Sequence, residues 1–365
     1  MLERSTDGRS KSAPIFSFSS TVVAALILVS CAVVPARAQN LGLSTSSGGV
    51  TIGGSKPNWT GGFGSINGFG IGTPGTGVTV ITSGVTGGAL YTTPVNFVVT
   101  GAGGPNRAVV RAHVSTNHTH PTVLQLKVCY PASGCASAAN YQTISLSSGT
   151  PTDVIAPTGV GNGTYIVWFG VFVSNLNGAS AFSGADPATV TLRSYNHPNN
   201  VLNDTDTLAL SKTVQTAVRF TLATAGGLTV SPGSDFSVAF GSVNGLGIAP
   251  GAGVTVSFPA GGALYATPYS IQPEFASFSS TNGTVNAYVS VDFAHPSILE
   301  LRDSSNGSTF NAISKIAGSP TVISSTLSSG SANTRYLGLF VSGTNGAGAF
   351  TGADSAGVRF TLVAP

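Results

Sequence analysis

Apolar and polar positions alternate over many short stretches of the chain. In residues 284–293, TVNAYVSVDF, every second side chain from Val285 to Phe293 is apolar, and the positions between them are polar apart from one tyrosine. A period of two residues is typical of a β-strand with one buried face and one face in water. Gly, Pro, Asn and Ser separate this run from similar runs at 253–258, 263–271, 298–302, 321–327, 336–342 and 358–363. Seven or eight short strands at this spacing predict an antiparallel β-sandwich.

Six segments occur twice in the same order, which indicates an internal duplication. The pairs are 63–71 with 240–248, 77–80 with 253–256, 88–94 with 262–268, 120–121 with 295–296, 177–186 with 345–354, and 218–222 with 358–362. The separation falls from 177 residues for the first pair to 140 for the last, so the first copy is expected to contain insertions. The predicted domains are residues 39–225 and 226–365, with a short Gly-rich joint at 223–227.

Two insertions are expected in the first copy. One surrounds Cys129 and Cys135, where the second copy has the shorter segment 303–307. These cysteines flank a segment with Pro and Gly, and exported chains meet oxidising conditions, so we expect a disulfide at a hairpin tip. The other insertion lies near residues 188–216 and is predicted to be an extra hairpin or a long loop.

The first 38 residues have the three parts of a secretory signal peptide. Basic residues come first, an apolar stretch covers 21–34, and an A-x-A site ends at Ala38. The stretch is shorter than the roughly 20 residues that span a bilayer. We therefore expect a mature chain from Gln39 that is secreted or on the cell surface and has no transmembrane span. The alternatives are a periplasmic protein, or a lipoprotein whose lipidated first residue is Cys31.

The fold class predicted from these patterns is all-β, with two tandem antiparallel β-sandwiches after the signal peptide. An immunoglobulin-like Greek-key topology is preferred, and a jelly roll is the alternative, because strand spacing does not determine strand order. At the level of class, the chain resembles secreted bacterial proteins built from immunoglobulin-like repeats. The resemblance rests on pattern alone and assigns no residue a role.

Composition narrows the classes of function. Charged residues make up only 7% of the chain, and the shortage of Lys, Glu and Arg disfavours solvent-exposed helices. Residues 1–38 hold four basic and two acidic side chains, so the formal charge falls from +3 to +1 without them. This nearly neutral chain lacks the basic surface that nucleic-acid binding requires.

Four aspartates are candidate calcium ligands. Asp186 and Asp354 end the repeated small-residue loop, and Asp204 and Asp206 form an unrepeated acidic pair. Calcium needs six to eight oxygen ligands, and each loop offers one carboxylate. The preferred interpretation of the repeated aspartates is therefore structural, with the carboxylate accepting backbone N–H groups, and no metal site is assigned.

The clustered histidines are also interpreted as structural. His113, His118 and His120 could supply a metal site, but the first two correspond to Tyr288 and Phe293 in the second copy. The repeated His-Pro pair, at 120–121 and 295–296, is predicted to fix a turn at a strand end.

No catalytic signature is found, so the expected protein is not an enzyme and has no cofactor. The first hypothesis is a secreted, non-catalytic bacterial surface or extracellular protein of duplicated sandwiches, with a structural or adhesive role. The alternative is a carbohydrate-binding protein that stacks sugars on exposed aromatic side chains, for which Tyr91, Tyr265 and Trp59 are the candidates. The expected partners are surface glycans or another extracellular protein.

Overall fold

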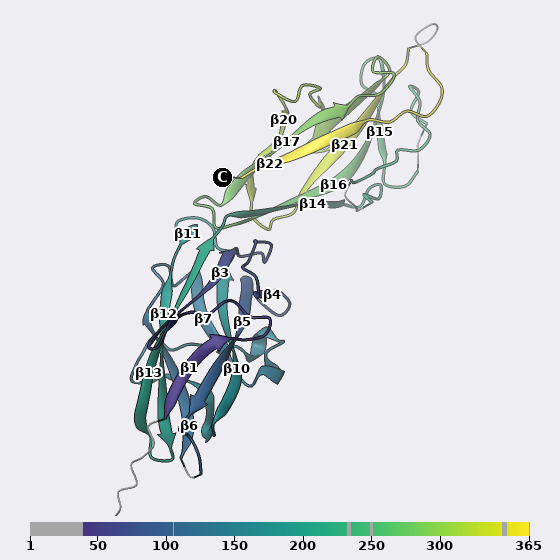
Figure 1. Ribbon diagram of the computed structural model, residues 1–365. Helices are drawn as coiled ribbons and strands as arrows, with labels where there is room; N and C mark the ends of the chain where they lie inside the picture. The colour runs from purple at the N-terminus through teal and green to yellow at the C-terminus, as the bar shows by residue number, and fades with distance from the viewer. Residues whose placement is uncertain (1–38, 105, 232–234, 249–250, 345–348, 365) are drawn as a thin grey trace, which may run out of the picture. The chain divides into compact units, whose positions relative to one another are not determined.

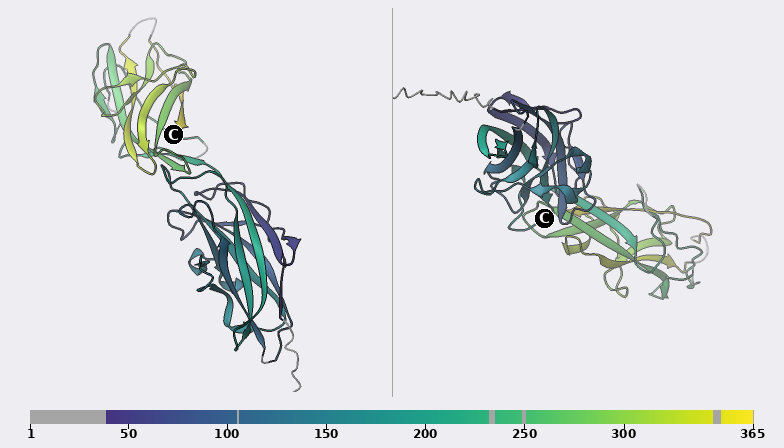
Figure 2. Two further views of the ribbon diagram at one scale, coloured as in Figure 1. Left: turned by 90° about the vertical axis from the view of Figure 1, so that its left-hand side faces the viewer. Right: turned by 90° about the horizontal axis from the view of Figure 1, so that it is seen from below.

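A computed structural model describes residues 39–104, 106–231, 235–248, 251–344 and 349–364. The predicted signal peptide and Cys31 lie outside these residues. The described chain is all-β, as predicted, and its strands form two sandwiches (Figures 1 and 2). Its two 3-10 helices, η1 (Ala132–Gly134) and η2 (Ala138–Asn140), have three residues each. Among the described residues, no helix has the length and apolar character to cross a membrane.

The first sandwich consists of two sheets. One has the strand order β1-β5-β10-β7-β8, with β4 also paired to β5. Its strands are β1 (Asn40–Thr45), β4 (Thr79–Ile81), β5 (Gly88–Thr100), β7 (Leu124–Cys129), β8 (Gln142–Thr143) and β10 (Gly163–Ser174). The other has the order β2-β3-β13-β12-β6-β9, with β11 also paired to β13. Its strands are β2 (Gly53–Ser55), β3 (Asn58–Ile66), β6 (Arg107–Thr116), β9 (Thr152–Val160), β11 (Gly184–Ala185), β12 (Ala188–His197) and β13 (Val201–Val214).

The core of the first sandwich lies between these sheets. Alternate residues point inward: Phe97 on β5 and Phe169 on β10 are fully buried, and so are Leu208 and Leu210 on β13. The pairing is antiparallel with one exception, because β13 runs parallel to β3. A parallel pair cannot be joined by a hairpin, so a pattern of short runs does not reveal it.

The second sandwich repeats this plan with fewer strands. One sheet has the order β14-β16-β21-β18-β19, with β15 also paired to β16, and the other has the order β20-β17-β22. The strands are β14 (Ala217–Thr224), β15 (Thr255–Ser257), β16 (Gly262–Ala276), β17 (Asn282–Val291), β18 (Leu299–Ser304), β19 (Asn311–Ala312), β20 (Thr321–Ser328), β21 (Asn333–Ser342) and β22 (Gly357–Val363).

Strand pairing changes how the two copies correspond. β14 pairs with β16 as β1 pairs with β5, so it is the first strand of the second sandwich and precedes the expected boundary at 225. β22 follows Asp354 as β12 follows Asp186, and each pairs with the equivalent strand, β17 or β6. The similar segments 218–222 and 358–362 are therefore not equivalent in the fold. Among the described residues, the first copy has four strands that the second lacks: β2, β3, β11 and β13. Of these, β13 forms a hairpin with β12.

Candidate functional site

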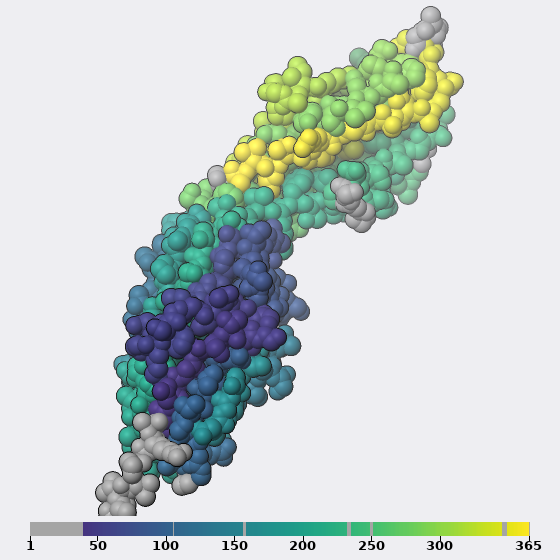
Figure 3. Space-filling view, in the orientation of Figure 1, coloured from purple at the N-terminus to yellow at the C-terminus, as the bar shows by residue number. Residues whose placement is uncertain are grey.

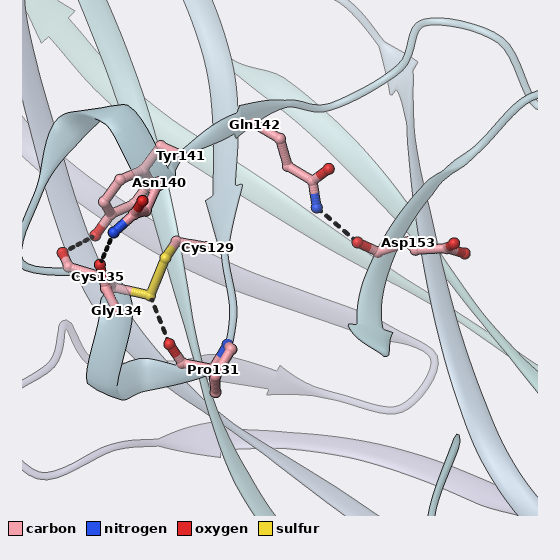
Figure 4. Close-up of a disulfide and its surroundings, with 8 residues drawn as sticks. All are labelled: Cys129, Pro131, Gly134, Cys135, Asn140, Tyr141, Gln142 and Asp153. Carbon is pink, nitrogen blue, oxygen red and sulfur yellow. Dashed lines mark hydrogen bonds between the residues drawn. A yellow bond between two sulfur atoms is a disulfide. The ribbon is translucent and has the colours of Figure 1, made fainter. Parts of the chain in front are cut away.

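The two cysteines of the first copy form the expected disulfide. Cys129 at the end of β7 is bonded to Cys135, which follows the short helix η1 (Figure 4). The Tyr141 hydroxyl donates to the Cys135 carbonyl at 3.1 Å. Leu90 packs with these three residues in a separate apolar cluster on the outer face of the sheet. The disulfide therefore stabilises the segment between β7 and β8, which packs against one face of the first sandwich.

The two repeated aspartates accept backbone N–H groups, as the preferred interpretation predicted. The carboxylate of Asp186 accepts the N–H of Thr119 at 2.9 Å and the N–H of His120 at 3.0 Å. It also lies 3.0 Å from Nδ1 of His120, which carries the proton because a carboxylate only accepts. The His120 ring stacks on Phe182, with ring centroids 3.8 Å apart. The sequence did not predict this contact between aspartate and histidine.

The second copy repeats the arrangement. Asp354 accepts the N–H groups of Ala294 and His295 at 3.0 Å, and His295 Nδ1 lies 2.9 Å from its carboxylate. The His295 ring stacks on Phe350, with ring centroids 3.7 Å apart.

The carbonyls of His120 and His295 each accept two N–H groups of the following residues, which confirms the predicted turns. The paired aspartate and histidine lie far apart in sequence, and each copy thereby ties the small-residue loop to the end of a strand.

Burial and hydrogen bonds shift the pKa values of Asp186, His118 and Lys212 in the first copy. Burial would raise the pKa of Asp186, but the hydrogen bonds from Thr119 and His120 outweigh it and hold the pKa below its ordinary value. Burial and the charge of Lys212 lower the pKa of His118 to about 4. Burial also lowers the pKa of Lys212 to about 8, against the attraction of Asp186. His118 is thus neutral at pH 7 and fills the position that Phe293 has in the second sandwich.

Asp204 and Asp206 both contact a lysine. The Lys56 ammonium forms a short ion pair with Asp204 and lies 3.5 Å from Asp206. Asp204 also accepts the N–H of Leu41 at 2.6 Å, and this hydrogen bond connects β13 to β1. Burial raises the pKa of Asp206. Among the residues that the structure describes, no three His, Cys, Asp or Glu side chains form a group that could hold a metal ion.

The aromatic candidates for sugar stacking are placed inside the protein. Tyr91 and Tyr265 are fully buried, and their hydroxyls donate to the carbonyls of Asn67 and Asn244 at 2.9 Å. Trp59 is half-buried against the core of the first sandwich. The neighbouring Leu90 and Leu264 are buried as well. The tyrosines therefore present no ring face to a ligand and anchor the repeated Asn-Gly turn instead.

One strand of the second sandwich lies at an open sheet edge, whereas the equivalent strand of the first sandwich has a neighbour on both sides. In the first sandwich, β12 lies between β6 and β13. Its equivalent β22 pairs only with β17, and none of the described residues pairs with its other edge. In the space-filling view, β22, coloured yellow, runs along the surface of the second sandwich (Figure 3). Val190 and Leu192 of β12 are fully buried, whereas the equivalent Val358 and Phe360 are only half-buried.

The open edge continues into a groove of about 1590 Å³ that both apolar and polar residues line. Its walls come from both sheets and from the segment after β14. They include Phe220, Leu222, Tyr269, Leu301, Leu339, Val358 and Phe360. In the first sandwich, β13 places Leu208, Leu210 and Val214 in the core beside β12. The groove therefore lies beside β22 on the side where β13 pairs with β12 in the first sandwich.

The repeated segments 63–71 and 240–248, which both begin with Phe-Gly-Ser, differ in structure because only the first sandwich contains β13. Phe63 and Ile66 are fully buried on β3, which lies parallel to β13. The equivalent Phe240 and Val243 are half-buried, and the described residues between β14 and β15 form no strand. An almost identical sequence thus forms a strand only where a neighbouring strand supplies hydrogen bonds and apolar cover.

Comparison with known proteins gives no family. No protein-family model and no curated protein match the chain. Among solved structures, it is similar to the CsuC-CsuE chaperone-tip adhesion subunit complex of Acinetobacter baumannii, with 12% identity, 89% of this chain and 100% of that chain covered, and a TM-score of 0.34. It is similar to the CupB6 tip adhesin of Pseudomonas aeruginosa, with 11% identity, coverages of 88% and 94%, and a TM-score of 0.31. It is also similar to the CooA pilin subunit of enterotoxigenic Escherichia coli, with 13% identity, coverages of 48% and 98%, and a TM-score of 0.27. With TM-scores below 0.5, these likenesses assign the chain neither a family nor a function.

Proposed function

We propose that the chain is an exported, non-catalytic extracellular protein whose second sandwich accepts a β-strand from a partner polypeptide. Its role is then structural or adhesive, as a subunit joined to its neighbour by strand addition. The observation that carries this proposal is the groove beside β22, at the place where the first sandwich holds its own strand β13.

The energetics favour an extended apolar segment as the occupant. Leu208, Leu210 and Val214 of β13 are buried to 2% exposure or less, and each such side chain contributes roughly 1.5 to 3 kcal/mol. A strand in the groove would also supply hydrogen bonds to the free edge of β22. Exposed edge strands otherwise tend to pair with other chains and aggregate. Within the described residues, β1 and β13 are each already paired in the first sandwich, so a different polypeptide is the proposed donor.

The carbohydrate alternative loses the residues on which it was based. Tyr91 and Tyr265 are inside the core, and their hydroxyls bond to the backbone. Sugar stacking needs an exposed aromatic face. The strand-acceptor proposal instead uses a surface on which Val358, Phe360 and Phe240 are only partly covered.

Hydrogen exchange tests the proposal directly. Residues 39–365 are mixed with a peptide that has the sequence of residues 203–214, or with a scrambled peptide of the same composition. We expect the first peptide, and not the scrambled one, to slow exchange in β22, while β12 serves as an internal control that does not change. Exchange in β22 that no apolar alternating peptide slows would contradict strand acceptance. Protection of β22 without peptide that increases with protein concentration would show that a second copy fills the groove.

A further inference from the structure

The strand that pairs with β12 on this side of the first sandwich carries a buried cation. Lys212 on β13 is only 4% exposed, between the inward-facing Leu210 and Val214. Lysine is rarely buried to this extent without a partner of opposite charge. The nearby acidic group is Asp186, whose attraction favours the charged form of Lys212.

The pairing register places Asp186 opposite Lys212. Gly184 and Ala185 of β11 pair with Val214 and Thr213, and the N–H of Asp186 donates to the Lys212 carbonyl at 3.4 Å. Beyond this point, Ala188 of β12 pairs with Leu210. The two side chains therefore lie on the same face of the ladder that β13 forms, and the Lys212 ammonium donates to the Leu210 carbonyl at 3.5 Å.

The second sandwich has the carboxylate but no such cation from a neighbouring strand. Asp354 is equivalent to Asp186, makes the same contacts with its His-Pro turn, and lines the groove. The other charged groups in the wall are Asp235 and Arg359. Arg359 is exposed on β22 and alternates with the half-buried Val358 and Phe360, so it is not on the face that Asp354 shares with the core.

We propose that the strand entering the groove carries a lysine or arginine opposite Asp354, in the position that Lys212 has on β13. This inference rests on the proposed strand-acceptor function and specifies the partner. The Asp354 side chain is 6% exposed, and a strand that covers the groove would remove its remaining contact with water, so a cation then compensates the buried negative charge. An acidic residue at the same position would bury two carboxylates together. The partner segment is accordingly apolar opposite Ala356 and Val358 and basic opposite Asp354, two residues after the apolar side chain that faces Ala356.

Peptide binding to residues 39–365 measures this preference. Three peptides have the sequence of residues 203–214: one unchanged, one with Lys212→Met and one with Lys212→Glu. We expect the unchanged peptide to bind at least about tenfold more tightly than the Lys212→Glu peptide, with the Lys212→Met peptide between them. The matched protein variant is Asp354→Asn, which removes the charge and should reduce the ratio to less than about threefold. Binding of the Lys212→Met peptide to this variant shows that its groove is intact.

The outcomes separate the inference from the function on which it rests. If all three peptides bind equally to the wild-type chain, strand acceptance holds and the cation preference is wrong. If none of them binds, strand acceptance itself is wrong. A preference for lysine that persists unchanged in a folded Asp354→Asn chain would assign the preference to another group, such as Asp235, and would overturn the pairing with Asp354.

Discussion

Replacing Asp186 by alanine should destabilise the first sandwich. The Asp186 side chain is 1% exposed and accepts the N–H groups of Thr119 and His120 as well as the His120 ring N–H. A buried donor left without an acceptor costs about 1 to 3 kcal/mol. The His120 side chain is 39% exposed, so water can reach part of the site, and the expected loss is at the lower end for two backbone donors, about 2 to 3 kcal/mol.

Tryptophan fluorescence during urea unfolding can measure this loss. The chain has two tryptophans, Trp59 on β3 and Trp168 on β10, so their emission reports the first sandwich selectively. The control is Asp153→Ala, because Asp153 makes a surface ion pair with Arg111 and should change stability by less than about 1 kcal/mol. In a thermal melt, the change at Asp186 corresponds to a decrease of roughly 5 to 10 °C.

The effect of Asp186 also depends on pH in a defined direction. Its pKa is below the ordinary aspartate value, so the ionised carboxylate stabilises the folded state above about pH 4, where the unfolded residue is also ionised. The difference between wild type and Asp186→Ala should shrink as pH falls through the lower folded pKa. Equal urea midpoints for the two proteins at pH 7 would refute the structural role. A calcium-dependent increase in stability seen in wild type but not in the variant would instead identify a metal site.

Three further predictions concern the first sandwich. Buried His118 has a pKa of about 4, so wild-type stability should fall between pH 6.5 and 4, and His118→Phe should remove this loss in urea titrations. Lys212 has a pKa of about 8, so stability should rise between pH 8 and 10.5, and Lys212→Met should abolish the rise; a rise that persists would contradict the assignment. Replacing Cys129 and Cys135 by serine should cost about 2 kcal/mol or less, because the bridged residues are only six positions apart; loss of folding by circular dichroism would contradict this.

The sequence predicted the features that depend on local pattern. Alternation located the strands, and the duplication indicated two sandwiches. The cysteine spacing predicted the disulfide, and the repeated Asp motif predicted a carboxylate that accepts backbone N–H groups. Each of these follows from residues close in sequence or from one motif present twice.

The features that the sequence did not reveal depend on pairing between distant strands. The segments 218–222 and 358–362 are similar because both are edge strands with alternating apolar residues, and this similarity concealed that β12 is the true equivalent of β22. The segment near 188–216 was therefore interpreted as an insertion, although it contains a core strand. A fragment of residues 226–365 was expected to form the second domain, but it would lack β14, and residues 217–365 are the better choice. The open groove depends on this strand pairing, so the sequence pattern did not reveal it.

The most direct test of strand acceptance is to give the second sandwich a copy of the strand that the first one has. Residues 198–214, which contain the turn after β12 and all of β13, are added after residue 365, and hydrogen exchange is measured in β22. We expect strong protection of the β22 edge amides in this chain, and no protection when proline replaces the residues that correspond to Leu208 and Leu210. Exchange in β22 that is equally fast in both chains would contradict the conclusion that the groove is an acceptor for a β-strand.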